Sequence, residues 1–157
     1  MKIVKGISIY AVLLLIPIIF FVYFNGKTVL KTCTDDYRTT DSIEYSIDEI
    51  KCSGDLLTIS GWFIYKGDSQ AINKCNKSVW IKNIDTNEFY ILKLDVTLRD
   101  DVADIIEDGV DYTNSGFEIS QNINDISEYG TEFEMYLCYT RNGVNYLRNT
   151  NQKIKLN

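Results

Sequence analysis

The sequence predicts an all-β fold: an immunoglobulin-like antiparallel β-sandwich with one short helical crossover, preceded by a single N-terminal transmembrane helix. From about residue 43 onward, short apolar stretches alternate with turn residues, a pattern typical of sandwiches and barrels. Residues 99–109 depart from the two-residue period and have helical spacing instead. Residues 7–24 form an uncharged apolar run that is long enough to cross a bilayer.

This apolar run, "ISIYAVLLLIPIIFFVYF", predicts a membrane anchor over residues 1–26. A cleavable signal peptide has a shorter apolar region that ends in small residues, whereas this run continues into "NGKTVLKTC". Signal cleavage and lipidation at Cys33 are the alternatives. Because only six residues precede the run, we expect the N-terminus to stay in the cytoplasm. The protein would then be a single-pass protein of the cell membrane with its body outside the cytoplasm.

The part after the anchor divides into a stalk and one domain. Residues 27–42 are rich in Thr and Asp and have no periodicity, so we expect a linker there. Residues 43–157 are long enough to bury a single core. We therefore expect one extracytoplasmic β-sandwich domain over 43–157.

The strands of this domain follow from two-residue alternation. In "DLLTISGWFIYKG", Leu57, Ile59 and Phe63 face one side, and Trp62 and Ile64 the other. The stretches "SVWIKNI" and "EFYILKLDV" flank a short turn at residues 85–87 and predict a hairpin. "FEISQNI" predicts a further strand. "EFEMYLCYT" has four apolar residues on one face and is joined to "VNYLRNTNQKIKL" by a tight Asn-Gly turn at residues 142–143.

The helical crossover is expected in "RDDVADIIEDG". Val102, Ile105 and Ile106 recur at helical spacing, an aspartate at 100 or 101 can cap the start, and Gly109 can end it. The acids of residues 100–111 match no EF-hand spacing, so a solvated helix start explains them better than a calcium site. We expect no metal and no other cofactor.

Arg99 is the most informative charged residue of this stretch. It stands next to Asp101, ahead of an apolar turn, and its guanidinium suits a bidentate pair that pins the crossover to the sandwich. Contact with a ligand is the alternative role for Arg99.

The four cysteines predict disulfides in an oxidising compartment. The chain has no C-x-x-C spacing and no histidine, which disfavours a zinc site. Among the possible pairings we expect Cys33 with Cys52 and Cys75 with Cys138. The alternative is that some of these cysteines are buried free thiols.

Charge and composition exclude several classes of function. The formal net charge is −6, which argues against nucleic acid as a partner. Without histidine, Ser-His-Asp and Cys-His catalysis are excluded. We therefore expect no catalytic residues and a protein that is not an enzyme. A small glycan-modifying enzyme that uses paired carboxylates is the alternative.

The order of several short elements resembles a known family. The elements are G-W, R-x-D-V and S-G-F, at positions Gly61, Trp62, Arg99, Asp101, Val102, Ser115, Gly116 and Phe117. This order resembles small β-sandwich modules attached to bacterial membrane proteins of surface-polysaccharide assembly, over residues 44–156. The chain departs from that pattern in its cysteines and at Asp100, where the family often has proline. The resemblance implies an extracytoplasmic sandwich associated with cell-envelope glycans.

Immunoglobulin domains offer a second, weaker analogy. "YLC" at residues 136–138 resembles their tyrosine-before-cysteine element, and Cys75 precedes it at about the separation of two bridged strands. Trp80 follows Cys75 too closely for the usual core tryptophan, so the analogy concerns the fold only.

Aromatic residues supply the candidate contact surface. Trp62 and Phe117 are expected in the core. Tyr65, Tyr112 and Tyr146 lie near turns and are the better candidates for ligand contact, together with Arg99. The function that we expect is a membrane-anchored binding or accessory module whose partner is a cell-surface glycan or an envelope protein. The alternative is an immunity or exclusion protein that binds a toxin or phage component.

Overall fold

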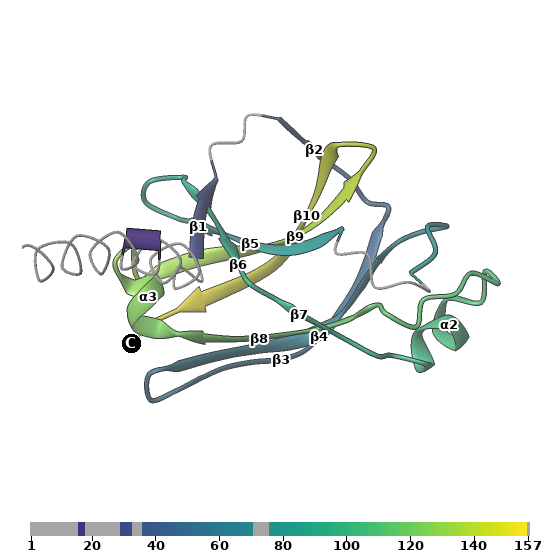
Figure 1. Cartoon of the computed structure of the whole chain (residues 1–157), viewed down its shortest axis with the longest axis horizontal. Helices are drawn as coiled ribbons and strands as arrows, with labels where there is room; N and C mark the ends of the chain where they lie inside the picture. The colour runs from purple at the N-terminus through teal and green to yellow at the C-terminus, as the bar shows by residue number, and fades with distance from the viewer. Residues whose placement is uncertain (1–15, 18–28, 33–35, 71–75, 157) are drawn as a thin grey trace, which may run out of the picture.

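The protein is built from two β-sheets that pack face to face. The computed structural model describes residues 16–17, 29–32, 36–70 and 76–156. The larger sheet has six strands in the order β1-β6-β5-β9-β10-β2, and the smaller has four in the order β3-β4-β8-β7 (Figure 1). The predicted all-β sandwich is therefore confirmed at the level of two mostly antiparallel sheets.

The bounds of the elements follow the predicted alternation closely. The six-stranded sheet consists of β1 (Val29–Thr32), β2 (Tyr37–Thr39), β5 (Lys77–Asn83), β6 (Phe89–Leu92), β9 (Glu132–Arg141) and β10 (Val144–Lys155). The four-stranded sheet consists of β3 (Ile43–Ser53), β4 (Leu56–Tyr65), β7 (Asp95–Thr97) and β8 (Gly116–Asn122). Two short helices connect strands, α2 (Asp101–Ile106) and α3 (Ile123–Ser127). The sequence predicted the first helix but not the second.

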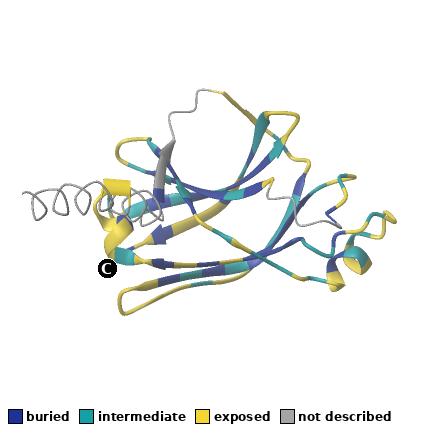
Figure 2. Cartoon of the chain, viewed as in Figure 1, coloured by how far each residue is buried: buried dark blue, intermediate teal, exposed yellow. Residues whose placement is uncertain are grey.

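The main core lies between the sheets. Leu57, Ile59 and Phe63 of β4 point inward and meet Met135 and Leu137 of β9, as their alternation predicts. All five side chains are fully buried. Figure 2 shows buried residues recurring along the strands of both sheets.

A second core covers the outer face of the six-stranded sheet. Trp80, Phe89, Cys138 and Leu147 cluster there, on the side that faces away from the small sheet. Strand β2 helps to enclose them, because the ring of Tyr37 packs edge-on against Phe89 at 5.6 Å between centroids.

Chain length shows that the six-stranded sheet must curve around this second core. Strands β1 and β2 are its opposite edges, yet only residues 33–36 join them. That connection spans at most about 18 Å. The edge strands of a flat six-stranded sheet would lie about 24 Å apart. Strands β1 and β2 thus lie in the range in which the sequence suggested a stalk, and both belong to the six-stranded sheet.

A third cluster lies on the outer face of the small sheet. Trp62 and Ile64 of β4 pack there against Val102 of α2 and Tyr112 of the following loop. The crossover helix therefore covers apolar residues that would otherwise face solvent. Trp62 and Phe117 are both buried, as predicted.

Candidate functional site

Arg99 joins α2 to the small sheet through its guanidinium. Its Nε and Nη2 donate to Oδ1 and Oδ2 of Asp101, both at 2.8 Å, and its Nη1 donates to Oδ2 of Asp48 at 2.6 Å. The hydrogen bond with Asp101 is the main reason that the pKa of Arg99 is raised, and it lowers the pKa of Asp101. The bidentate pair predicted from the sequence is present, and it fastens the start of α2 to β3.

Asp48 reaches Arg99 because β3 contains a bulge. Ile47 pairs with Gly61 and Glu49 with Ser60, which leaves Asp48 as the extra residue. The sequence indicates this bulge, because apolar residues occupy every second position up to Ile47 and then continue at Ile50 instead of at position 49. Asp48 was not among the site residues predicted from the sequence.

Two glycines allow the strands to approach each other at this point. A Cβ on Gly61 would lie 2.3 Å from the carbonyl oxygen of Ser46, and one on Gly116 would lie 2.8 Å from Cγ of Arg99. The G-W, R-x-D-V and S-G-F elements thus meet in one place. Their geometry explains them as structural residues of the small sheet.

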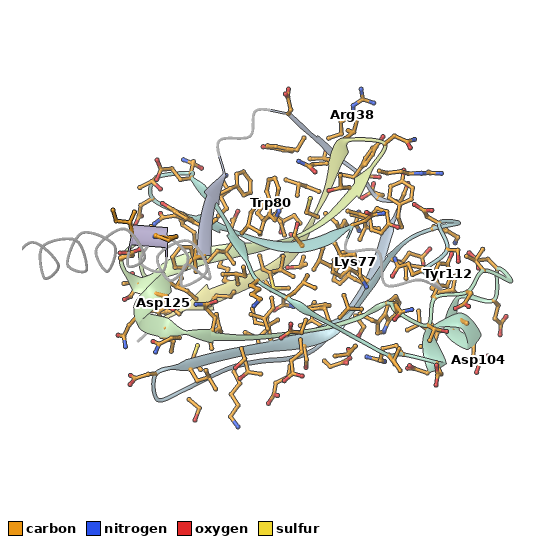
Figure 3. The ribbon with its side chains drawn as sticks, in the orientation of Figure 1. Arg38, Lys77, Trp80, Asp104, Tyr112 and Asp125 are labelled. Atoms are coloured by element: carbon orange, nitrogen blue, oxygen red, sulfur yellow. The ribbon has the colours of Figure 1, made fainter. Side chains whose placement is uncertain are left out.

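The acids of the crossover do not assemble into a metal site. Asp101 is engaged by Arg99, and Asp108 accepts a hydrogen bond from the hydroxyl of Tyr112 at 2.6 Å. Asp104 is exposed on α2 (Figure 3). In the part of the chain that the structure describes, no group of three or more ligating side chains is positioned to hold a metal ion.

The helix boundaries differ slightly from those expected. Asp100 is the N-cap of α2, but its side chain makes no capping hydrogen bond. The helix ends at Ile106, and its C-cap is Glu107 in the left-handed conformation (φ 55°), two residues before Gly109.

Tyr112 is not a surface residue, in contrast to the expectation from its position near a turn. It is fully buried in the cluster beneath α2 (Figure 3). Its hydroxyl accepts a hydrogen bond from the backbone N–H of Gly67 at 2.9 Å, in addition to its bond to Asp108. Burial raises the pKa of Tyr112 to about 12. Tyr112 therefore ties the loop after β4 to the crossover and cannot contact a ligand directly.

Tyr65 and Tyr146 do come together at one end of the sandwich. Their rings, from different sheets, pack edge to face with centroids 5.4 Å apart. Tyr139 lies behind them, 5.6 Å from Tyr65, and the guanidinium of Arg141 sits 5.2 Å above the Tyr65 ring. Tyr65 and Tyr146 are partly exposed, whereas Tyr139 is buried. We call these four residues the end aromatic cluster.

Neighbouring polar groups fix the orientation of the end aromatic cluster. Asp68 lies 3.7 Å from Nε of Arg141. Burial, with smaller contributions from Asp68, raises the pKa of Tyr139 to about 12. An aromatic pair held by an arginine and a buried tyrosine keeps its geometry without a ligand.

Shallow grooves border the N-terminal segment of residues 36–41. One of about 390 Å³ is lined by residues 39–41 on one side and by residues of β9 and β10 on the other, including Tyr136 and Arg148. A second, of about 370 Å³, continues past Asp41 and Arg148 toward Trp62 and Ile105. Asp41 and Arg148 were not among the site residues predicted from the sequence, because they are distant in sequence and form no local motif.

The expected disulfides are not seen. Cys52 is an exposed free thiol at the end of β3, and Cys138 is a buried free thiol in the second core. Their expected partners, Cys33 and Cys75, lie outside the described residues. Burial raises the pKa of the Cys138 thiol to about 11, so Cys138 is a packing residue in this structure.

The expected membrane anchor also lies outside the described residues, apart from Ile16 and Pro17. Among the helices of the described ranges, none has the length and apolar character needed to span a membrane.

Comparisons with protein families, with curated proteins and with solved structures find no match for this chain.

Proposed function

We propose that this protein is a membrane-anchored binding module whose immunoglobulin-like sandwich stands outside the cytoplasm and recognises a cell-surface glycan. The observation that carries the proposal is the end aromatic cluster. It presents two partly exposed tyrosine rings, from different sheets, with an arginine beside them. Tyrosine combines an apolar face with a polar hydroxyl, and this suits the mixed surface of a sugar ring.

The chemistry of the described residues supports binding more than catalysis. The acids of the crossover are engaged in structural contacts or point to solvent. The thiol of Cys138 is shielded in a core. The elements that resemble surface-polysaccharide modules support a glycan as the ligand, while their residues serve the fold.

A glycan array probed with the purified full-length chain tests the proposal. We expect saturable binding that falls at least about tenfold in the double variant Tyr65→Ala/Tyr146→Ala, since each ring contributes of order 1 kcal/mol. Tyr129→Ala is the matched control, because Tyr129 is also half-buried and stacked on another tyrosine, but near α3 at the opposite end of the sandwich.

Absence of binding to every glycan would overturn the proposal. Specific capture of an envelope protein or of a toxin or phage component, with no glycan bound, would assign the protein to the accessory or immunity class instead.

A further inference from the structure

The groove of about 390 Å³ beside residues 39–41 exists because β2 is short. Strand β2 pairs with β10 only from Asn145 to Leu147, so the edge of β10 is uncovered beyond that point. We call this site the edge groove. It lies between residues 39–41 and the side chains of Tyr136, Arg148, Asn149 and Asn151.

An irregularity in β10 shapes the wall of the edge groove. The register between β9 and β10 shifts between Asn149 and Lys153, and Asn151 takes the left-handed conformation with φ of 57°. Thr150 turns inward, where its hydroxyl donates to the carbonyl oxygen of Met135 at 2.8 Å. Asn149 and Asn151 are consequently both exposed on the groove side of this turn.

A chain of hydrogen bonds holds this wall in place. The amide of Asn149 donates to the hydroxyl of Tyr136 at 3.2 Å, which in turn donates to Glu134 at 3.1 Å. The other side of the Asn149 amide accepts from the backbone N–H of Asn151 at 2.7 Å. The side-chain amide of Asn151 makes no hydrogen bond within the described residues and stays available as both donor and acceptor.

An ion pair between Arg148 and Asp41 crosses the edge groove. Nη1 of Arg148 contacts Oδ1 of Asp41, whose side chain is almost fully exposed. Nε of Arg148 is shielded from solvent and has no hydrogen-bond partner in the described structure. The side chain as a whole is 32% exposed, so the outer nitrogens of the guanidinium face the groove. The pair offers donors and an acceptor close together but little net charge.

We propose that the edge groove binds an uncharged saccharide, with Arg148, Asp41 and Asn151 as its hydrogen-bonding residues. Sugar hydroxyls both donate and accept, which matches this mixed set of groups. The volume of about 390 Å³ is within the range of small-molecule sites. An anionic sugar is disfavoured, because Asp41 already compensates Arg148 and Glu134 lies behind Tyr136. This proposal rests on the glycan-binding function and adds a second contact region and a ligand class to it.

Titration of the full-length chain with maltotriose, cellotriose and chitotriose, followed by calorimetry, tests the edge groove. We expect at least one of these uncharged trisaccharides to bind, and trigalacturonate to bind more weakly than that trisaccharide. Arg148→Lys, which removes the guanidinium, and Asn151→Gly, which keeps the left-handed backbone, should each weaken binding by about tenfold. Asn87→Gly is the matched control, since Asn87 is exposed and has a φ of 60° in a distant turn.

The outcomes separate the two proposals. Unchanged affinity in Arg148→Lys and Asn151→Gly, with loss in the Tyr65/Tyr146 variant, overturns the edge groove and leaves the glycan-binding function standing. Tighter binding of trigalacturonate overturns the uncharged class. If a glycan binds on the array but none of the three trisaccharides binds, the edge groove is also overturned. Absence of any glycan binding overturns both proposals.

Discussion

Replacing Gly61 by alanine tests the reading of the G-W element as a structural contact. A strand glycine with ordinary dihedral angles usually gains about 0.4–1 kcal/mol of stability on change to alanine, because the unfolded chain loses freedom. At Gly61, however, the new Cβ would lie 2.3 Å from the carbonyl oxygen of Ser46 and 3.1 Å from Cα of Ile47. Both contacts are backbone atoms of the β3 bulge, so β3 itself must move.

The size of the effect follows from these two opposing contributions. Forcing an extra methyl into a packed site costs about 1–3 kcal/mol, which exceeds the gain from the unfolded state. We expect a net loss of about 1–2 kcal/mol. With an m-value of about 2 kcal/mol/M, the urea midpoint should fall by about 0.5–1 M.

Equilibrium urea unfolding, followed by the fluorescence of buried Trp62 and Trp80, measures this shift. Ser60→Ala is the matched control, since Ser60 neighbours Gly61 on β4 and is half-buried; its midpoint should change little. A Gly61→Ala chain that is as stable as the wild type, or more stable, would refute the bulge contact.

Three further predictions concern the crossover and the cysteines. The hydrogen bonds from Arg99 lower the pKa of Asp101 in the folded protein. Their contribution to the free energy of unfolding is therefore fully present above the pKa of Asp101 in the unfolded chain, and it is lost as the pH falls through the lower pKa of the folded state. Asp101→Asn should consequently make the urea midpoint depend less on pH between about pH 5 and pH 2. Tyr112→Phe should cost about 1 kcal/mol in the same unfolding assay, because it removes the hydroxyl that accepts from Gly67 and donates to exposed Asp108; a neutral result would contradict the tie between loop and crossover. Iodoacetamide should label Cys52 rapidly in the native chain and Cys138 only after unfolding, as read by peptide mass spectrometry; equal labelling of both would show that the second core is open.

Strong local alternation explains the parts of the fold that the sequence predicted. The apolar faces of β4 and β9 repeat every second residue over long strands, and each face is set by burial on one side. The helical spacing of Val102 and Ile106 likewise placed α2. The Arg99–Asp101 pair was predictable because its members are two positions apart.

The missed features depend on contacts between distant segments. Strands β1 and β2 are short edge strands of four and three residues, too short to show a periodic pattern, and they form only by pairing with distant strands, β1 with β6 and β2 with β10. Tyr112 follows a turn signal, but Trp62 and Val102 bury it from other elements. The Asp41–Arg148 pair joins residues far apart in sequence, so no local pattern could indicate it.

Backbone amide chemical-shift mapping of the full-length chain tests the central claim most directly. The chain would be titrated with the glycan that binds best on the array. We predict shifts concentrated around Tyr65 and Tyr146 and continuing along β10 to Asn151. Shifts confined to the crossover around Asp104, or to the opposite end near α3, would contradict the account.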